Sequence, residues 1–331
     1  MPLFGKKSKS AEGGLQLMPY MQLKEILCKR KVVGATVAYD GSLILLAVEQ
    51  KDVKVPFPIF EQPGWASFPE TKSRDAYKAW LLRIDDSVRQ DVEVAVLDNA
   101  FPYVDAFPDG SFIVASARCR YDGHSGELNA SIYDQNGAPQ KQICLGDGIN
   151  DVAVSSASLI WTSYFDEGVF GNFGWGGGNS PPPIGAHGLV CFDREGRQVW
   201  QYPNLEDGVE YSIDDCYAMT IANDEVWLCF YSDFPLARID SRKQIKYWNN
   251  KIAGASTIAV DADKVLLYGG YSEDKTRICV QQCSEDGQIR SVFEGKLQLP
   301  AADKFMSVKG RCGALHVITD DCWHKLSISD I

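Results

Sequence analysis

The sequence contains no long run of apolar residues, and this absence limits where the protein can reside. No stretch of its 331 residues is long and apolar enough to cross a bilayer as a helix. The N-terminal segment Met1–Ser10 carries positive charge but is not followed by seven or more apolar residues, so it does not fit a secretory signal. We therefore expect a cytoplasmic protein without a membrane partner.

Basic residues are also scarce. The chain has 33 Lys and Arg against 44 Asp and Glu, which gives a formal net charge of −11. Such a charge repels a phosphate backbone and offers little counterion release, so we expect no nucleic-acid partner. The same charge favours a basic protein or a cationic ligand, although many acidic proteins use their charge only to stay soluble.

Signatures of catalysis are missing as well. The glycine-rich segment Gly174–Gly178 is not followed by a helix or by Lys-Ser/Thr, which excludes a P-loop and a dinucleotide fingerprint. None of the histidines stands beside a Gly-x-Ser-x-Gly motif. These histidines are His124, His187, His316 and His324. We expect no catalytic residue and no cofactor.

The cysteines do not form a metal-binding pattern. The chain has 10 cysteines, and only Cys279 and Cys283 are closely spaced. This pair lacks a second cysteine pair or a nearby histidine, so it falls short of a zinc motif. Most cysteines lie within apolar, strand-like runs, which indicates buried free thiols in a reducing compartment.

The chain does contain an internal repeat. Each copy has an apolar strand, a tight turn with Asp, Asn, Gly or Ser, a second strand, a variable loop and a third strand. The clearest copy places two strands around the Asp109-Gly110 turn. The six copies span Thr36–Glu49, Tyr103–Tyr133, Asp151–Asp193, Asp215–Asp240, Thr257–Ser284 and Phe305–Ser327.

Four-stranded repeats of this kind predict an all-β fold, a β-propeller of six blades. A seventh blade remains an alternative if Lys51–Leu97 hides another unit. The last copy lacks a strand, so we expect a strand from near the N-terminus, with Glu25–Val33 as a candidate, to complete that blade and remove its open edge. We assign residues 1–20 to a mobile tail and residues 21–331 to a single propeller domain.

Loop lengths separate the two faces of the predicted propeller. The turns between first and second strands are tight, whereas long segments connect second and third strands on the opposite face. The long segments are Lys51–Asp75, Arg120–Glu127, Phe165–His187 and Ser232–Pro235. Long loops on a rigid scaffold commonly carry binding residues. We expect Asp105, Asn150, Asp151, Asp214 and Asp215 to surround the mouth of the central channel on this long-loop face.

Aromatic and acidic side chains dominate the candidate binding residues on this face. Glycines between the aromatics allow close backbone approach to a partner, while the rings supply flat contact area. An alternative is a flexible lid with Phe170, Phe173 and Trp175 folded back onto the blade. The candidates are Tyr103, Asp105, Asp151, Tyr164, Asp166, Glu167, Phe170, Asn172, Trp175, Asp215, Tyr217, Tyr231 and Asp233.

The middle of the chain resembles a group of uncharacterised bacterial propeller-like proteins. The resemblance covers roughly Asp105–Asp240 and rests on short motifs in two neighbouring repeats. These motifs are Ile160-Trp161, Tyr164–Asn172, Gly174-Trp175, Gly188–Val190, Phe192-Asp193, Asp215–Ala218 and Tyr231–Leu236. The resemblance implies a propeller fold and a bacterial origin, and it implies no activity.

Three functional hypotheses follow from these observations. The first is a non-enzymatic scaffold that binds a protein partner, with a basic toxin domain neutralised by a bacterial immunity protein as its narrower form. The second is a metal-dependent hydrolase of the lactonase or gluconolactonase kind, with Ca²⁺ or Mg²⁺ held by Asp105, Asn150, Asp151 and Asp215. These four residues could instead satisfy turn amides. The third is a small-molecule or glycan binder. The oligomeric state is left open.

Overall fold

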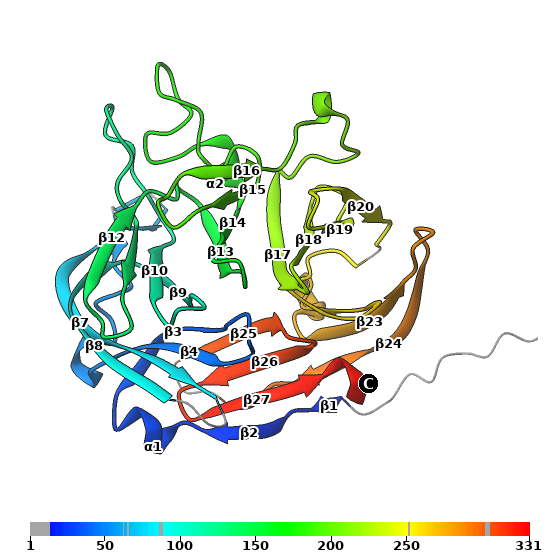
Figure 1. The fold of residues 1–331 in the computed structure, drawn as a ribbon, viewed down its shortest axis with the longest axis horizontal. Helices are drawn as coiled ribbons and strands as arrows, with labels where there is room; N and C mark the ends of the chain where they lie inside the picture. The colour runs from blue at the N-terminus through cyan, green and yellow to red at the C-terminus, as the bar shows by residue number, and fades with distance from the viewer. Residues whose placement is uncertain (1–13, 62, 65, 86–88, 251, 302–304) are drawn as a thin grey trace, which may run out of the picture.

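The protein is a six-bladed β-propeller. The computed structural model describes residues 14–61, 63–64, 66–85, 89–250, 252–301 and 305–331. Six sheets of four or five strands follow one another and surround a central axis (Figure 1). A seventh blade is absent from the described residues, because the insertion in blade 1 forms only a short 3-10 helix and a two-stranded hairpin.

The blades are numbered in chain order. Within each blade, the strands are given from the innermost to the outermost. Blade 1 has β3 (Lys31–Val37), β4 (Leu43–Val48), β7 (Lys72–Ile84) and β8 (Arg89–Asn99). Blade 2 has β9 (Pro102–Ala106), β10 (Phe112–Ser116), β11 (Ala130–Tyr133) and β12 (Pro139–Ile143). Blade 3 has β13 (Ile149–Val154), β14 (Ile160–Tyr164), β15 (Leu189–Phe192) and β16 (Gln198–Gln201).

The second half of the ring follows the same plan. Blade 4 has β17 (Asp215–Ala222), β18 (Glu225–Tyr231), β19 (Leu236–Ile239) and β20 (Ile245–Trp248). Blade 5 has β21 (Thr257–Asp261), β22 (Lys264–Tyr268), β23 (Arg277–Cys283) and β24 (Ile289–Gln298). Blade 6 has β25 (Met306–Arg311), β26 (Ala314–Thr319) and β27 (Cys322–Ser327).

Aspartates at the start of tight turns explain why the sequence reverses where it does. The Asp109 carboxylate accepts a hydrogen bond from the backbone N–H of Ser111 at 3.0 Å. Asp134 and Asp240 accept equivalent bonds two residues on, each at 2.8 Å. Such Asx turns satisfy backbone donors that would otherwise be left without a partner. The repeated aspartates therefore fix the strand ends of several blades.

The hydrophobic core lies between adjacent blades. Leu46 of blade 1 packs in one cluster with Val104 and Phe112 of blade 2. Leu45 on the other face of blade 1 shares a cluster with Trp323 of blade 6. Successive residues of a strand point to opposite sheet faces, so each inner strand supplies apolar side chains to two neighbours. The ring is thereby packed across the junction between its first and last blades.

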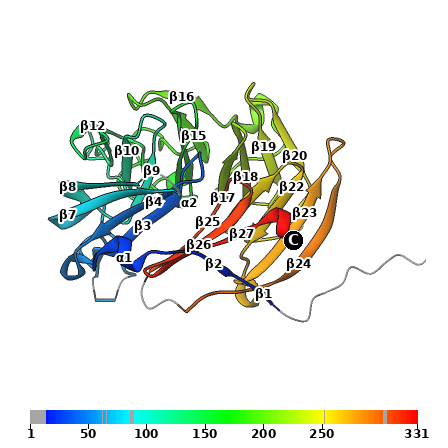
Figure 2. The ribbon, with the colours of Figure 1, turned by 60° about the horizontal axis from the view of Figure 1, so that its bottom comes forward.

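An N-terminal strand closes the ring, as expected, but it is not formed by the candidate residues 25–33. β2 (Met18–Gln22), rather than a strand within residues 25–33, pairs with β27 and completes blade 6. β1 (Leu15–Gln16) pairs in parallel with β24 of blade 5, so this N-terminal segment joins two blades (Figure 2). The expected tail of residues 1–20 was therefore too long, because residues 15–16 and 18–20 belong to sheets. Residues 1–13 lie outside the described residues.

The two faces differ in their connections, as the sequence predicts. The hairpin of β5 (Ile59–Phe60) and β6 (Phe68–Pro69) lies between β4 and β7, after the 3-10 helix η1 (Gln50–Asp52). The helix α2 (Asp166–Phe170) and the 3-10 helices η2 (Leu205–Asp207) and η3 (Ser272–Asp274) lie on the same face. The remaining short helices are α1 (Lys24–Leu27) and η4 (Ile328–Asp330). No helix in the described part of the chain has the length and apolarity needed to span a membrane.

Candidate functional site at the long-loop mouth

Aromatic residues of blades 4 and 5 form a cluster on the long-loop face. Phe234, in the connection between β18 and β19, is only 9% exposed and lies at the centre of this cluster. Its ring centroid is 5.2 Å from that of Tyr217 and 5.8 Å from that of Tyr231. Tyr271 lies 6.0 Å from Phe234 and donates a 2.7 Å hydrogen bond to the Tyr217 hydroxyl. The cluster thus fixes two aromatic side chains, Tyr231 and Tyr271, that are half exposed.

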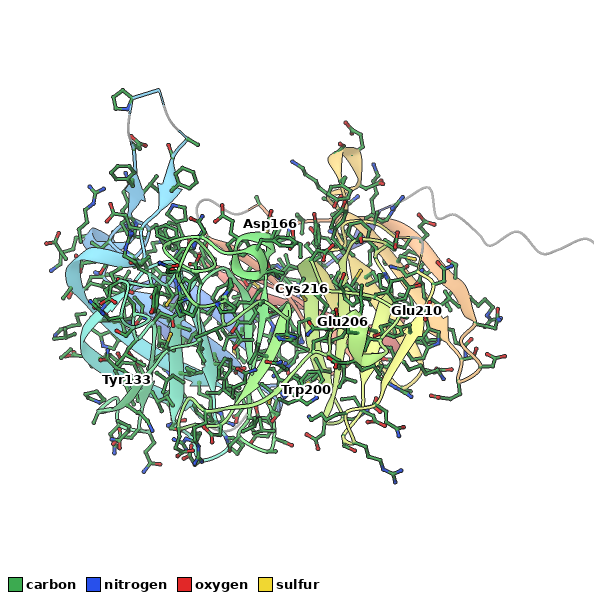
Figure 3. All side chains as sticks on the ribbon, turned by 90° about the horizontal axis from the view of Figure 1, so that it is seen from above. Tyr133, Asp166, Trp200, Glu206, Glu210 and Cys216 are labelled. Atoms are coloured by element: carbon green, nitrogen blue, oxygen red, sulfur yellow. The ribbon has the colours of Figure 1, made fainter. Side chains whose placement is uncertain are left out.

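Two carboxylates lie beside this cluster. Asp166 begins α2 and is exposed, and α2 packs against the strand β17 that Asp215 begins. Figure 3 shows Asp166 toward the same side of the molecule as the projecting β5–β6 hairpin. Burial and then the negative charge of Asp166 raise the pKa of the Asp215 carboxyl to about 6. No cation among the described residues offsets these effects on Asp215.

We call Asp166, Asp215, Tyr217, Tyr231, Phe234 and Tyr271 the mouth cluster. Burial, the hydrogen bond with Tyr271 and the negative charge of both aspartates raise the pKa of Tyr217. Burial is the largest of these causes, and the two aspartates add a smaller electrostatic contribution of the same direction. A positively charged group would relieve the repulsion, and aromatic faces also attract cations.

Glu167 has a different environment from Asp166. The buried Arg118 guanidinium contacts the Glu167 carboxylate at 2.5 Å and donates two hydrogen bonds to Asp147, at 2.9 and 2.8 Å. The guanidinium also lies 4.4 Å from the ring centroid of Phe173. Arg118 therefore attaches α2 to blade 2, and Glu167 is part of this attachment.

A close backbone contact supports the same position of α2. Gly148 has a φ of +68°, and a Cβ there would lie 2.2 Å from the backbone nitrogen of Gly168. Only glycine tolerates both the left-handed conformation and this approach. The sequence thereby places α2 against the connection between blades 2 and 3.

The channel below the mouth contains an ion pair. Lys309 of β25 lies 2.7 Å from the Asp151 carboxylate, and both side chains are largely buried. Asn150 donates a 3.4 Å hydrogen bond to the backbone carbonyl of Tyr217, and the Tyr103 hydroxyl donates one to Ile149 at 3.2 Å. The channel cavity has a volume of about 130 Å³. Its polar lining includes Asn150, Asp151, Tyr217, Thr257, Lys309 and Arg311.

Asp105 does not lie at the long-loop mouth, which corrects its expected position. It is the fourth of five residues in β9 and stands just before the tight turn, so it lies at the opposite end of the channel. Its carboxylate accepts a 2.7 Å hydrogen bond from the Val154 N–H and lies 3.7 Å from Arg311. Complete burial, partly offset by Arg311, raises its pKa to about 6. Asp105 therefore connects two blades.

Two aromatic candidates are turned inward. Tyr164 is fully buried and donates a 2.5 Å hydrogen bond to the carbonyl of Leu145. Trp175 is 7% exposed, and its indole N–H donates to the carbonyl of Cys119 at 2.9 Å. The lid alternative thus describes Trp175 correctly. These two side chains are not available at the surface.

The other candidates of these loops are spread over the face. Asn172 accepts a 2.7 Å hydrogen bond from the N–H of Phe173 and lines a separate hollow of about 740 Å³ beside the β5–β6 hairpin. Phe170 is 67% exposed and lines another hollow, of about 430 Å³, with His187. Asp233 is exposed next to the mouth cluster in sequence.

The proposed metal ligands do not converge. Asp105 and Asp151 lie at different levels of the channel and have cationic neighbours, Arg311 and Lys309. Across the described ranges, no group of three or more His, Cys, Asp or Glu side chains is placed to hold a metal ion. The set Asp105, Asn150, Asp151 and Asp215 therefore does not fit a divalent cation.

Sequence reasoning missed Phe234 and Tyr271 as members of the site. Phe234 stands in the aromatic-acidic segment Phe230–Pro235, but its central position depends on loops from two blades. Tyr271 follows Gly269 and Gly270, whose positive φ values of 99° and 159° turn the chain toward the mouth. The Gly-Gly-Tyr segment was the available signal for Tyr271.

Comparisons with known proteins give one family match and several solved structures at low identity, and they assign no activity. The chain matches the YxzG family over residues 189–285, which is less than half of its length. A comparison with curated proteins gives no match.

Several solved structures are similar to this chain at low identity. A catalytically inactive virginiamycin B lyase from Staphylococcus aureus, solved with Quinupristin, is 12% identical with a TM-score of 0.42, covering 93% of this chain and 98% of the lyase. Hsv2 from Kluyveromyces lactis is 10% identical, with a TM-score of 0.46 and coverages of 88% and 72%. A functionally unknown protein from Desulfotomaculum acetoxidans is 11% identical, with a TM-score of 0.45 and coverages of 89% and 84%. Over one segment, residues 189–285, the chain is similar to the YxzG family.

Proposed function

We propose that the protein is a non-enzymatic binding scaffold that holds a basic protein partner at the mouth cluster. The observation that carries this proposal is the pair of carboxylates, Asp166 and Asp215, that no described cation neutralises beside two half-exposed tyrosines. Other acidic residues of this face, such as Glu167, already have a cationic partner within the protein.

The chemistry of the cluster favours a lysine or arginine side chain of the partner. A cation between Asp166 and Asp215 would relieve their repulsion, and the faces of Tyr231 and Tyr271 could contact its apolar stem. The overall charge of −11 would also steer a basic protein toward the molecule. A cytoplasmic location belongs to the same proposal, and it is supported by the ten free cysteines.

A tagged protein tests the proposal by capture from a lysate of its source organism. We expect the wild type to retain a stoichiometric amount of a partner. The Asp166→Asn/Asp215→Asn variant should retain at least tenfold less of this partner. Glu195→Gln/Asp263→Asn is a matched control, because it removes the same charge from the tight-turn face. Equal loss in both variants, or no loss in either, would contradict the assignment of this face.

Binding should also depend on pH. A cationic partner requires ionised Asp215, and the pKa of this carboxyl is raised to about 6 in the free protein. Capture should therefore weaken between pH 7 and pH 5, since protonation of Asp215 removes its charge.

A narrower form of the proposal is a bacterial immunity protein that neutralises a toxin domain. Its support is electrostatic, since acidic proteins are suited to bind basic domains. The captured partner should then arrest growth when expressed alone. Co-expression of the wild type, but not of the Asp166→Asn/Asp215→Asn variant, should restore growth. A captured partner that is harmless when expressed would overturn this narrower form and leave the scaffold proposal standing.

A further inference from the structure

We propose that Cys119 and Cys144 are a redox-active dithiol that closes to a disulfide. Their sulfur atoms lie 3.7 Å apart, which is van der Waals contact. Cys119 stands in the connection after β10, and Cys144 directly follows β12, so both lie at the long-loop end of blade 2. The two cysteines are far apart in sequence, and the fold alone brings them together.

The local geometry allows the bond to form with a small movement. A disulfide has an S–S length of about 2.05 Å, so the sulfurs must approach by roughly 1.7 Å. Rotation of the two side chains and adjustment of the connecting loops can supply this movement. By contrast, Cys279 and Cys283 are four residues apart on β23, which places their Cα atoms about 13 Å apart. That pair is beyond the reach of a disulfide.

The surroundings hold the two thiols in this arrangement. A Cβ on Gly126 would lie 2.8 Å from the Cys144 sulfur and 2.7 Å from a ring carbon of Trp175, so the chain passes directly over the pair. The backbone of Cys119 donates to Asp147 and accepts from Trp175. Cys119 is buried, whereas Cys144 is partly exposed, so we expect an oxidant to react first with Cys144.

The reaction needs an oxidant, for which hydrogen peroxide serves. A hydrogen bond from Cys119 and one from the Gly146 N–H lower the pKa of Cys144, which favours its thiolate as the nucleophile. The thiolate attacks one peroxide oxygen, the O–O bond breaks, and the departing oxygen leaves as water after taking a proton. The Cys119 sulfur then displaces the sulfenic hydroxyl of Cys144 as a second water. Two thiols are oxidised to one disulfide while one peroxide is reduced to two waters.

Closure would act on the candidate site through known contacts. Moving Cys119 would disturb the hydrogen bonds to Asp147 and Trp175, and Asp147 in turn positions Arg118 against α2. This consequence rests on the proposed function, whereas formation of the disulfide does not.

The test treats the reduced full-length protein with hydrogen peroxide and then counts its thiols after denaturation. We expect a loss of two of the 10 thiols, a mass decrease of two hydrogen atoms and a peptide pair joined through Cys119 and Cys144. Dithiothreitol should restore both thiols. The Cys144→Ser variant should form no such bond, and Cys279→Ser/Cys283→Ser should form it as the wild type does.

Retention of all thiols in the wild type would overturn the proposal, and so would a disulfide between other cysteines or oxidation of Cys144 to sulfinic acid alone. Peptide mapping of the wild type decides the result even if Cys144→Ser fails to fold. Partner capture by the oxidised protein is measured separately. A failure there would concern the binding scaffold and not the dithiol.

Discussion

The two neighbouring acidic residues at the start of α2 have opposite roles in the structure. Glu167 turns toward blade 2 and pairs with the buried Arg118, whereas Asp166 lies near Asp215 of blade 4 without a described cation. The charge of Glu167 is paired with Arg118 and helps to hold the loop, whereas the charges of Asp166 and Asp215 are available to a partner. The two residues are adjacent in sequence and both are acidic, so the neighbours that each side chain meets decide the difference.

The largest effect should follow from removing the cation on the blade 2 side. Arg118→Ala should lower the free energy of unfolding by about 3–5 kcal/mol, because it leaves the buried Asp147 carboxylate without its partner. Urea denaturation measures this change. Arg197→Ala removes an exposed cation that pairs with Asp193, so it should change the free energy of unfolding far less than Arg118→Ala does. Similar losses in the two variants would remove the distinction between the regions.

Trp175 and Phe170 belong to the same loop, but the Trp175 side chain is buried and the Phe170 side chain is exposed. Trp175→Ala should cost about 3 kcal/mol of unfolding free energy, because it empties a buried position and removes the hydrogen bond to Cys119. Phe170→Ala should change stability by less than about 0.5 kcal/mol, since this ring is 67% exposed. Thermal unfolding of both variants measures these changes. A larger loss of stability in Phe170→Ala than in Trp175→Ala would contradict the burial of Trp175.

On the blade 4 side, removing a charge should stabilise the free protein. The folded-state pKa of Asp215 is raised, so the native protein binds more protons than the unfolded chain between about pH 4 and pH 6, and stability falls as pH rises through this window. Asp215→Asn should therefore gain roughly 1 kcal/mol at pH 7, a value discounted because the side chain is only half buried. The gain should vanish below about pH 4.

The same substitution at Asp147 gives the opposite sign and serves as the control. Burial raises the pKa of the Asp147 carboxyl too, but Asp147→Asn leaves the buried Arg118 guanidinium without the carboxylate that accepts two hydrogen bonds from it, so it should destabilise the protein at pH 7. Denaturation of both variants across pH 4–8 compares them. A loss of stability in Asp215→Asn at pH 7 would show that Asp215 already has a stabilising partner.

Much of the fold could be predicted from the sequence, because blades repeat local signals. Tight turns such as Asp109-Gly110 and the apolar strands beside them are encoded within a few residues. Closure by an N-terminal strand was predicted, but the residues that form this strand were missed for a physical reason. Met18–Gln22 contains Pro19, and its side chains are mostly exposed, so the segment shows neither an apolar run nor clear alternation. Its pairing with β27 is a contact across almost the entire chain.

The site was less predictable, because its members come from different blades. The location of Asp105 depends on its position along the strand, since it lies near the end of β9 and not at its start. The orientation of an aromatic side chain can depend on a backbone acceptor far away in sequence. Trp175, for example, turns inward and donates a hydrogen bond to the carbonyl of Cys119. Asp166 and Asp215 were predicted as candidates, but their proximity depends on how α2 packs against β17. Loop composition indicated the correct face without indicating which side chains remain free.

The most direct test of an unneutralised mouth is an NMR titration of the Asp215 carboxyl carbon, alone and with a short lysine-rich peptide. We predict a midpoint near pH 6 in the free protein, a lower midpoint in Asp166→Asn, and a further fall when the peptide binds the wild type. The Asp166→Asn shift should be partial, because burial is the larger cause. A midpoint near the ordinary value of 3.8 in the free protein, or one that saturating peptide leaves unchanged, would contradict the account.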